Sequence, residues 1–154
     1  MSEIFELDEM IKKSVNRERL SYEMYRQWKG RLKDENGNKA LAMLMREEEG
    51  HIKLLEMTLA DKNFDRLGRR DQPRKGPPLR IPDVHEITED TTAKEVIAFA
   101  IHHEERAVQY YSRYMDTFRD TPLFEFFAHM KVEEEKHKDR LETIFLRDYA
   151  GRKG

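Results

Sequence analysis

The residues best suited to chemistry are four glutamates and two histidines that recur in one pattern. They are Glu18, Glu48, His51, Glu104, Glu134 and His137. A shift of the sequence by 86 residues lays the first three on the last three without a gap. The spacing Glu-x-x-His, which occurs twice, places a carboxylate and an imidazole on one face of a helix. Such a set of oxygen and nitrogen donors suits iron or manganese.

Position carries more weight than the motif, because a chain rich in glutamate produces single Glu-x-x-His spacings by chance. Each of the six residues interrupts an apolar helical stripe, as Glu18 does between Val15 and Tyr22. All six are therefore expected to face the core. Buried carboxylates repel one another and are costly to desolvate, so they should either be protonated or bind cations. Two divalent metal ions would balance four negative charges.

The elements that position these residues are four amphipathic helices, indicated by apolar residues three or four apart. A short turn near residues 34–38 predicts a helical hairpin over about 3–62, and a second hairpin is expected over about 92–148. Thr92 and Glu95 predict a capping box at the start of the third helix. Thr121 and Pro122 predict the N-cap and first residue of the fourth.

The connector, residues 63–90, contains four prolines and two glycines and cannot continue a helix. Fully extended it could reach roughly 90 Å, more than the ~40 Å of a long helix, so it can run the whole length of the bundle. Helices two and three are then parallel. We therefore expect one all-α domain, residues 1–154, forming a four-helix bundle with a long crossover and an internal two-fold repeat. Counted from the two turns, the six residues lie at one level.

Composition excludes several other classes of site. The chain has no cysteine, which rules out disulfides, thiolate catalysis and Cys-ligated metal centres within it. A net charge of −2 gives no general reason to expect nucleic-acid or anionic-membrane binding. The acidic N-terminus lacks the features of a signal peptide, and no apolar stretch has the length of a membrane span. We expect a cytoplasmic protein.

On these residues, the chain resembles the ferritin-like di-iron carboxylate superfamily, specifically its rubrerythrin branch, from residue 5 to about 148. The resemblance implies a ferritin-like four-helix bundle with a centre of two iron ions. Manganese and mixed centres use similar ligands. The ligand roles implied are mainly terminal carboxylates for Glu18 and Glu104, bridging carboxylates for Glu48 and Glu134, and terminal nitrogens for His51 and His137.

The same resemblance implies a function. It is that of an oxidoreductase that reacts Fe(II) with O2 or peroxide, as a ferroxidase or a peroxidase. Tyr25 and Tyr111 match tyrosines whose phenols hydrogen-bond ligand carboxylates in rubrerythrins. Full rubrerythrins also carry a Cys-ligated domain that delivers electrons, so here a separate donor protein is expected, and a homodimer is implied. Two alternatives stay open: a non-catalytic iron or manganese binding or storage protein, and a metal-free helical scaffold.

The remaining charged residues are interpreted as surface features. Four glutamates lie about 100° to either side of the ligand glutamates and are predicted to face solvent: Glu47, Glu49, Glu133 and Glu135. His102 and His103 are likewise predicted to be surface residues. The basic connector could bind an acidic partner, but we interpret it as a solvated loop.

Overall fold

A computed structural model describes residues 3–67 and 78–149, with side chains from residue 6 onward. The helices are α1 (Glu3–Trp28), α2 (Glu35–Asp61), α3 (Ala93–Thr117) and α4 (Leu123–Asp148), with a short 3-10 helix, η1 (Phe64–Arg66), after α2. The described residues contain no strand. The prediction of an all-α four-helix bundle is therefore confirmed. None of the helices described is long and apolar enough to cross a bilayer.

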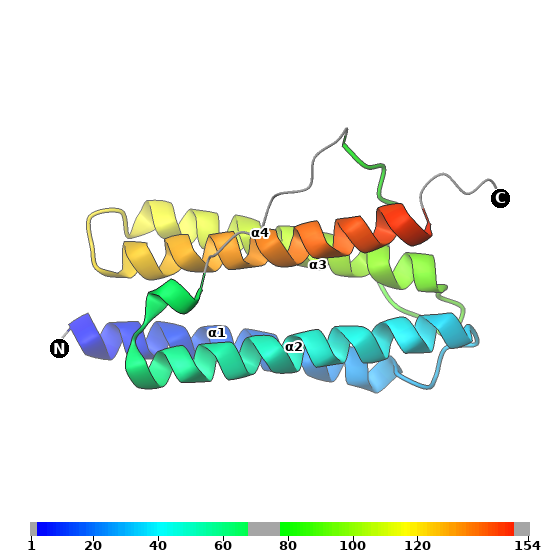
Figure 1. Ribbon diagram of the computed structural model, residues 1–154, viewed down its shortest axis with the longest axis horizontal. Helices are drawn as coiled ribbons and strands as arrows, with labels where there is room; N and C mark the ends of the chain where they lie inside the picture. The colour runs from blue at the N-terminus through cyan, green and yellow to red at the C-terminus, as the bar shows by residue number, and fades with distance from the viewer. Residues whose placement is uncertain (1–2, 68–77, 150–154) are drawn as a thin grey trace.

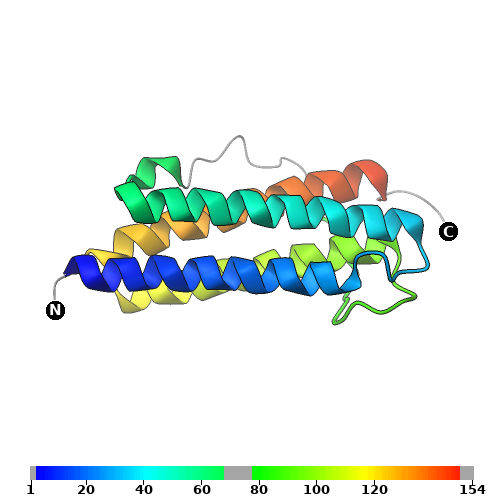
Figure 2. The ribbon, with the colours of Figure 1, turned by 90° about the horizontal axis from the view of Figure 1, so that it is seen from below.

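The helices form two antiparallel hairpins, α1 with α2 and α3 with α4, stacked one on the other (Figure 1). The turns of the two hairpins lie at opposite ends of the bundle (Figure 2). Helices α2 and α3 therefore run parallel, as the long connector predicted. Residues 68–77 lie outside the described residues, so the prediction for the basic centre of the connector stays a prediction.

Hydrogen bonds at one end of the bundle fix the start of α2 against the start of α3. Asp34 caps α2 by accepting from the Asn36 backbone N–H at 3.1 Å, and its second oxygen accepts from the Ala93 N–H at 2.8 Å. Gly37 allows close packing here, because a Cβ at this position would lie 2.8 Å from Leu32 Cδ2. Asp34 thus links the two hairpins at this end of the bundle.

Of the two helix starts in the second hairpin, the structure confirms the sequence prediction for α3 but not the one for α4. The capping box of Thr92 and Glu95 is present at the start of α3. The prediction for α4 was wrong, because Pro122 occupies the N-cap and Thr121 donates its hydroxyl to the Phe118 carbonyl at 2.8 Å. The Thr121 hydroxyl therefore bonds back to the end of α3, and only its backbone carbonyl takes part in the start of α4, by accepting from the Phe124 N–H at 3.1 Å.

The core consists of two apolar clusters with a polar layer between them. The cluster near the start of α2 and α3 includes Tyr25, Leu41, Val96, Phe99, Leu141 and Phe145. The cluster at the other end includes Ile11, Leu55, Tyr111, Phe126, Phe127 and Met130. Along every helix, the candidate ligands fall between residues of the first cluster and residues of the second. Apolar packing on both sides therefore separates the polar layer from the bundle ends.

Candidate metal centre

Each hairpin supplies one glutamate from its first helix and a Glu-x-x-His pair from its second. The first ligand group is Glu18, Glu48 and His51, and the second ligand group is Glu104, Glu134 and His137. Within each group, one ligand atom from every residue lies within 4.8 Å of the others. The structure therefore brings together all six residues that the sequence singled out. Their role as metal ligands stays a prediction.

The two groups form one continuous site. His51 Nδ1 lies 3.5 Å from carboxylate oxygens of both Glu18 and Glu48. In the second group, His137 Nδ1 lies 3.8 Å from Glu104 and 3.5 Å from Glu134. The two imidazoles stack with ring centroids 3.5 Å apart and an interplanar angle of 7°. Each histidine thus turns the same nitrogen, Nδ1, toward its carboxylates.

The site is buried and holds polar atoms that the protein does not satisfy. Five of the six residues are 7% exposed or less, and the His51 side chain is 11% exposed. Five buried oxygen or nitrogen atoms of the site have no hydrogen bond to any described residue: Glu48 Oε2, Glu104 Oε2, His137 Nδ1 and both ring nitrogens of His51. Buried polar groups are normally hydrogen-bonded, so such a concentration of orphaned acceptors points to a ligand. Four carboxylates and two imidazoles fit a pair of divalent metal ions in both charge and donor type.

The carboxylates have unequal proton affinities in the metal-free protein. Burial, followed by the neighbouring carboxylates, raises the pKa of Glu48 and that of Glu134 well above the ordinary value. Burial acts in the same direction on Glu18 and Glu104, but contacts with the partner glutamate and histidine outweigh it and lower the pKa. In each group, therefore, the Glu-x-x-His glutamate binds a proton more tightly than the lone glutamate does.

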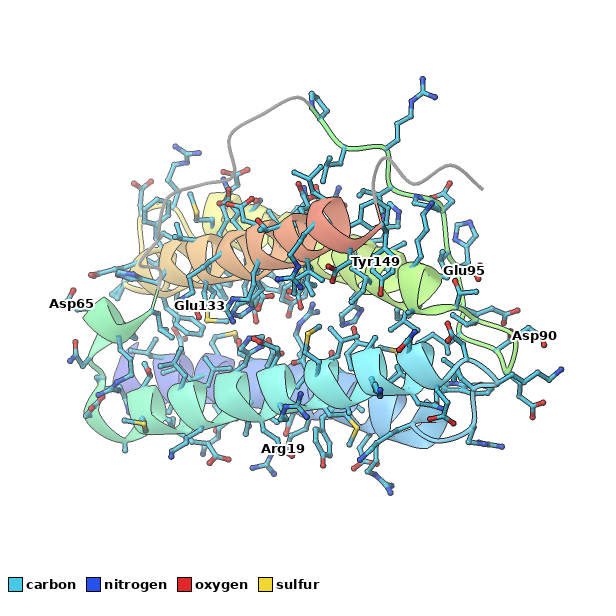
Figure 3. All side chains as sticks on the ribbon, turned by 45° about the vertical axis from the view of Figure 1, so that its right-hand side comes forward. Arg19, Asp65, Asp90, Glu95, Glu133 and Tyr149 are labelled. Carbon is cyan, nitrogen blue, oxygen red and sulfur yellow. The ribbon has the colours of Figure 1, made fainter. Side chains whose placement is uncertain are left out.

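Glu133 corrects one of the sequence predictions. It was expected to face solvent, but it is 4% exposed and lies on the side of α4 that faces the first hairpin (Figure 3). Its Oε1 lies 3.1 Å from His137 Nε2, the ring nitrogen that faces away from the ligand carboxylates. In a bundle each helix packs against two neighbours, so the buried arc extends beyond the central stripe. The spacing of four residues between Glu133 and His137 was the available signal.

A second correction concerns the histidines of α3. His103, predicted to be a surface residue, is partly buried, hydrogen-bonds Ser21 Oγ at 2.8 Å and stacks on Phe99. Burial lowers the pKa of this imidazole. His102 is also only partly exposed, and its Nε2 lies 2.9 Å from the Pro82 carbonyl oxygen. Both histidines therefore support packing between elements.

The two tyrosines predicted beside the site are buried there, but their contacts differ from the expectation. Tyr111 donates its hydroxyl to Ser14 Oγ at 2.8 Å rather than to a ligand carboxylate. Tyr25 packs edge-on against Phe99 and His103. Burial, and then the nearby carboxylates, raise the pKa of both phenols, so the hydroxyls stay protonated at neutral pH.

A surface hollow of about 440 Å³ leads to the imidazoles between α2 and α4. His51 and His137 line it together with the glutamates Glu47 and Glu133, and its other lining residues include Arg46, Lys136 and Arg140. The apolar clusters cover the site along the bundle axis. The hollow therefore offers small molecules and ions a lateral approach to the histidines.

Of three comparisons with known proteins, one found a match, and that match agrees with this geometry. A search of curated proteins and a search of solved structures each returned no match. The family model that describes the ferritin-like domain matches residues 9–148, which include all four helices except the first residues of α1. Two facing Glu/Glu/His groups of the kind compatible with a di-iron site lie within the matched region. The chain therefore belongs to the ferritin-like family.

Proposed function

We propose that this protein is a rubrerythrin-like non-haem di-iron oxidoreductase that reacts Fe(II) with O2 or peroxide. The observation that carries the proposal is the pair of facing ligand groups, in which five buried nitrogen and oxygen atoms lack hydrogen bonds within the described residues. A scaffold without metal would be destabilised by these atoms, since an unsatisfied buried polar group costs about 1–3 kcal/mol.

The six ligand residues would hold two iron ions, which when bound supply the electrons that reduce the oxidant. Glu18 and Glu104, already ionised, provide two negative charges that attract cations. Glu48 and Glu134 would release their protons when the metal ions bind, so that four carboxylates would balance the charge of two divalent ions. The apolar clusters limit water around the site, and the lateral hollow admits a small oxidant.

Three further features belong to the same proposal. A separate protein delivers electrons, because the chain has no cysteine with which to build an iron–sulfur or rubredoxin-type entry site. The protein works as a homodimer, and it is located in the cytoplasm. Iron is the proposed metal, and the donor set also suits manganese.

Anaerobic titration with Fe(II), followed by O2 or peroxide, tests this function. We expect two iron ions per chain and repeated consumption of peroxide when a chemical reductant is present. His137→Ala should reduce the iron stoichiometry, and His129→Ala, a partly exposed histidine on the same helix, serves as the matched control. A single oxidation per site without turnover would favour iron storage. Iron binding below 0.1 ion per chain would refute both functions.

A further inference from the structure

The two ligand groups differ in how the protein holds their histidines. Under the 86-residue repeat, Glu133 corresponds to Glu47, and each stands four residues before its histidine. Glu133 has a side chain 5% exposed, and its Oε1 lies 3.1 Å from His137 Nε2. Its other oxygen lies 3.3 Å from the Lys136 ammonium group. The Glu133 carboxylate is therefore fixed at both oxygens.

Glu47 does not perform this role for the first group. Its side chain is 33% exposed, and its Oε2 accepts a hydrogen bond from Arg140 on α4 at 2.6 Å. The same oxygen lies 4.0 Å from His51 Nε2, beyond hydrogen-bonding distance. Within the part of the chain that the structure describes, neither ring nitrogen of His51 has a hydrogen bond, whereas in His137 only Nδ1 lacks one.

The sequence explains the asymmetry at two positions where the repeat breaks down. Lys136, which pairs with Glu133, corresponds to Gly50 in the first hairpin, so Glu47 has no cation one turn away on its own helix. Arg140 corresponds to Leu54. The second hairpin therefore supplies a cation to both glutamates, and the one it supplies to Glu47 draws that carboxylate away from His51.

We propose that Glu133 is a positioning residue that makes the second ligand group the tighter of two metal positions. Arg140, by holding Glu47, leaves the first group weaker and more readily exchanged. This inference rests on the proposed di-metal function. A carboxylate that accepts from Nε2–H commits the imidazole to ligation through Nδ1, fixes its orientation and raises its basicity. Loss of such a partner typically weakens metal binding by about 10–100-fold.

Anaerobic titration with Co(II), monitored by calorimetry and by visible absorption, tests the inference. We expect two binding steps in the wild type, with dissociation constants separated by about 10–100-fold. His137→Ala should remove the tight step and His51→Ala the weak one. The visible spectrum of the first Co(II) equivalent reports the ligands of the tight position. A general loss of stability would not alter this spectrum.

Variants of the two repeat-related glutamates separate positioning from general electrostatics. Glu133→Ala should weaken the tight step by about 10–100-fold, and Glu133→Gln, which keeps an acceptor oxygen for Nε2–H, should recover part of that loss. Glu47→Ala, the matched control, should leave both steps nearly unchanged. Arg140→Ala should tighten the weak step by releasing Glu47 toward His51.

The possible failures are distinguishable. Two indistinguishable steps in the wild type, or equal effects of Glu133→Ala and Glu47→Ala, would overturn the inference and leave the di-metal function intact. If Glu133→Gln folds and melts like the wild type but binds the first Co(II) ion no more tightly than Glu133→Ala does, that result would also count against positioning through the hydrogen bond. A complete absence of Co(II) binding would overturn the di-metal function and this inference together.

Discussion

Replacing Glu134 by glutamine should stabilise the metal-free protein at neutral pH. Burial, followed by the carboxylates of Glu104 and Glu18, raises the pKa of Glu134 well above its ordinary value. Between the ordinary pKa of the unfolded chain and the raised pKa of the folded one, only the folded state binds this proton. Stability therefore falls as pH rises through this window, by up to about 1.4 kcal/mol per pH unit from this group. Glutamine does not titrate, so the variant lacks this loss.

From pH 5.5 to pH 7.5, the advantage of Glu134→Gln over the wild type should therefore grow by up to about 2.7 kcal/mol. For a domain of this size, each kcal/mol shifts the melting temperature by about 2–4 °C. The expected gain over that interval is thus up to about 5–11 °C. The other carboxylates of the site share the protons that Glu134 would otherwise bind alone, so this value is an upper bound.

Metal should reverse the order of stability. An ion present at one hundred times its Kd stabilises the folded state by about 2.7 kcal/mol, so two ions should raise the wild-type melting temperature by about 10–20 °C. Glu134→Gln removes a ligand carboxylate and should retain less than half of that rise.

Thermal melts with EDTA and with Mn(II), at pH 5.5, 6.5 and 7.5, measure both effects. Glu49→Gln, an exposed glutamate next to Glu48 in sequence, is the control and should follow the wild type. Equal Mn(II) shifts for wild type and Glu134→Gln would refute the metal role of this residue. Parallel pH profiles without metal would refute the protonation argument.

Other predictions concern the packing that positions the site, and all are read from denaturant unfolding. Asp34→Ala should lower the unfolding free energy by about 1–3 kcal/mol, because α2 loses its cap and a backbone N–H of α3 loses its acceptor; an unchanged value would show that this link between the hairpins contributes nothing. Phe126→Ala, at a side chain 0% exposed, should cost about 3–5 kcal/mol, whereas Leu20→Ala, at a position 71% exposed, should stay within about 0.5 kcal/mol. Similar losses for the two would contradict the assigned core. Tyr111→Phe should cost about 1 kcal/mol by removing the hydrogen bond to Ser14, with metal stoichiometry unchanged; a lost metal ion would instead assign the phenol a role in ligation.

The sequence predicted the bundle and the six clustered residues because both depend on helical geometry alone. A polar residue within an apolar stripe must face the core, and the distance of each from its turn sets its height. The length of the connector predicted that α2 and α3 run parallel. The contact of Asp34 with the start of α3 agrees with this arrangement.

What the sequence did not predict depends on contacts between helices. The burial of Glu133 follows from the packing of α4 against the first hairpin, which widens the buried arc beyond the stripe. The capture of Glu47 by Arg140 joins residues far apart in the chain. The same is true of the hydrogen bonds between His103 and Ser21 and between Tyr111 and Ser14. Periodicity gives the direction of a side chain but does not identify its partner.

Anomalous diffraction from crystals of the protein soaked anaerobically in Fe(II), recorded above and below the iron absorption edge, would locate the iron ions at their ligands. We expect two iron peaks per chain, one at the first ligand group and one at the second, between the imidazole Nδ1 atoms and the four carboxylates. Crystals that show no iron peak at these six residues, or peaks only at surface carboxylates, would contradict the proposed di-iron centre.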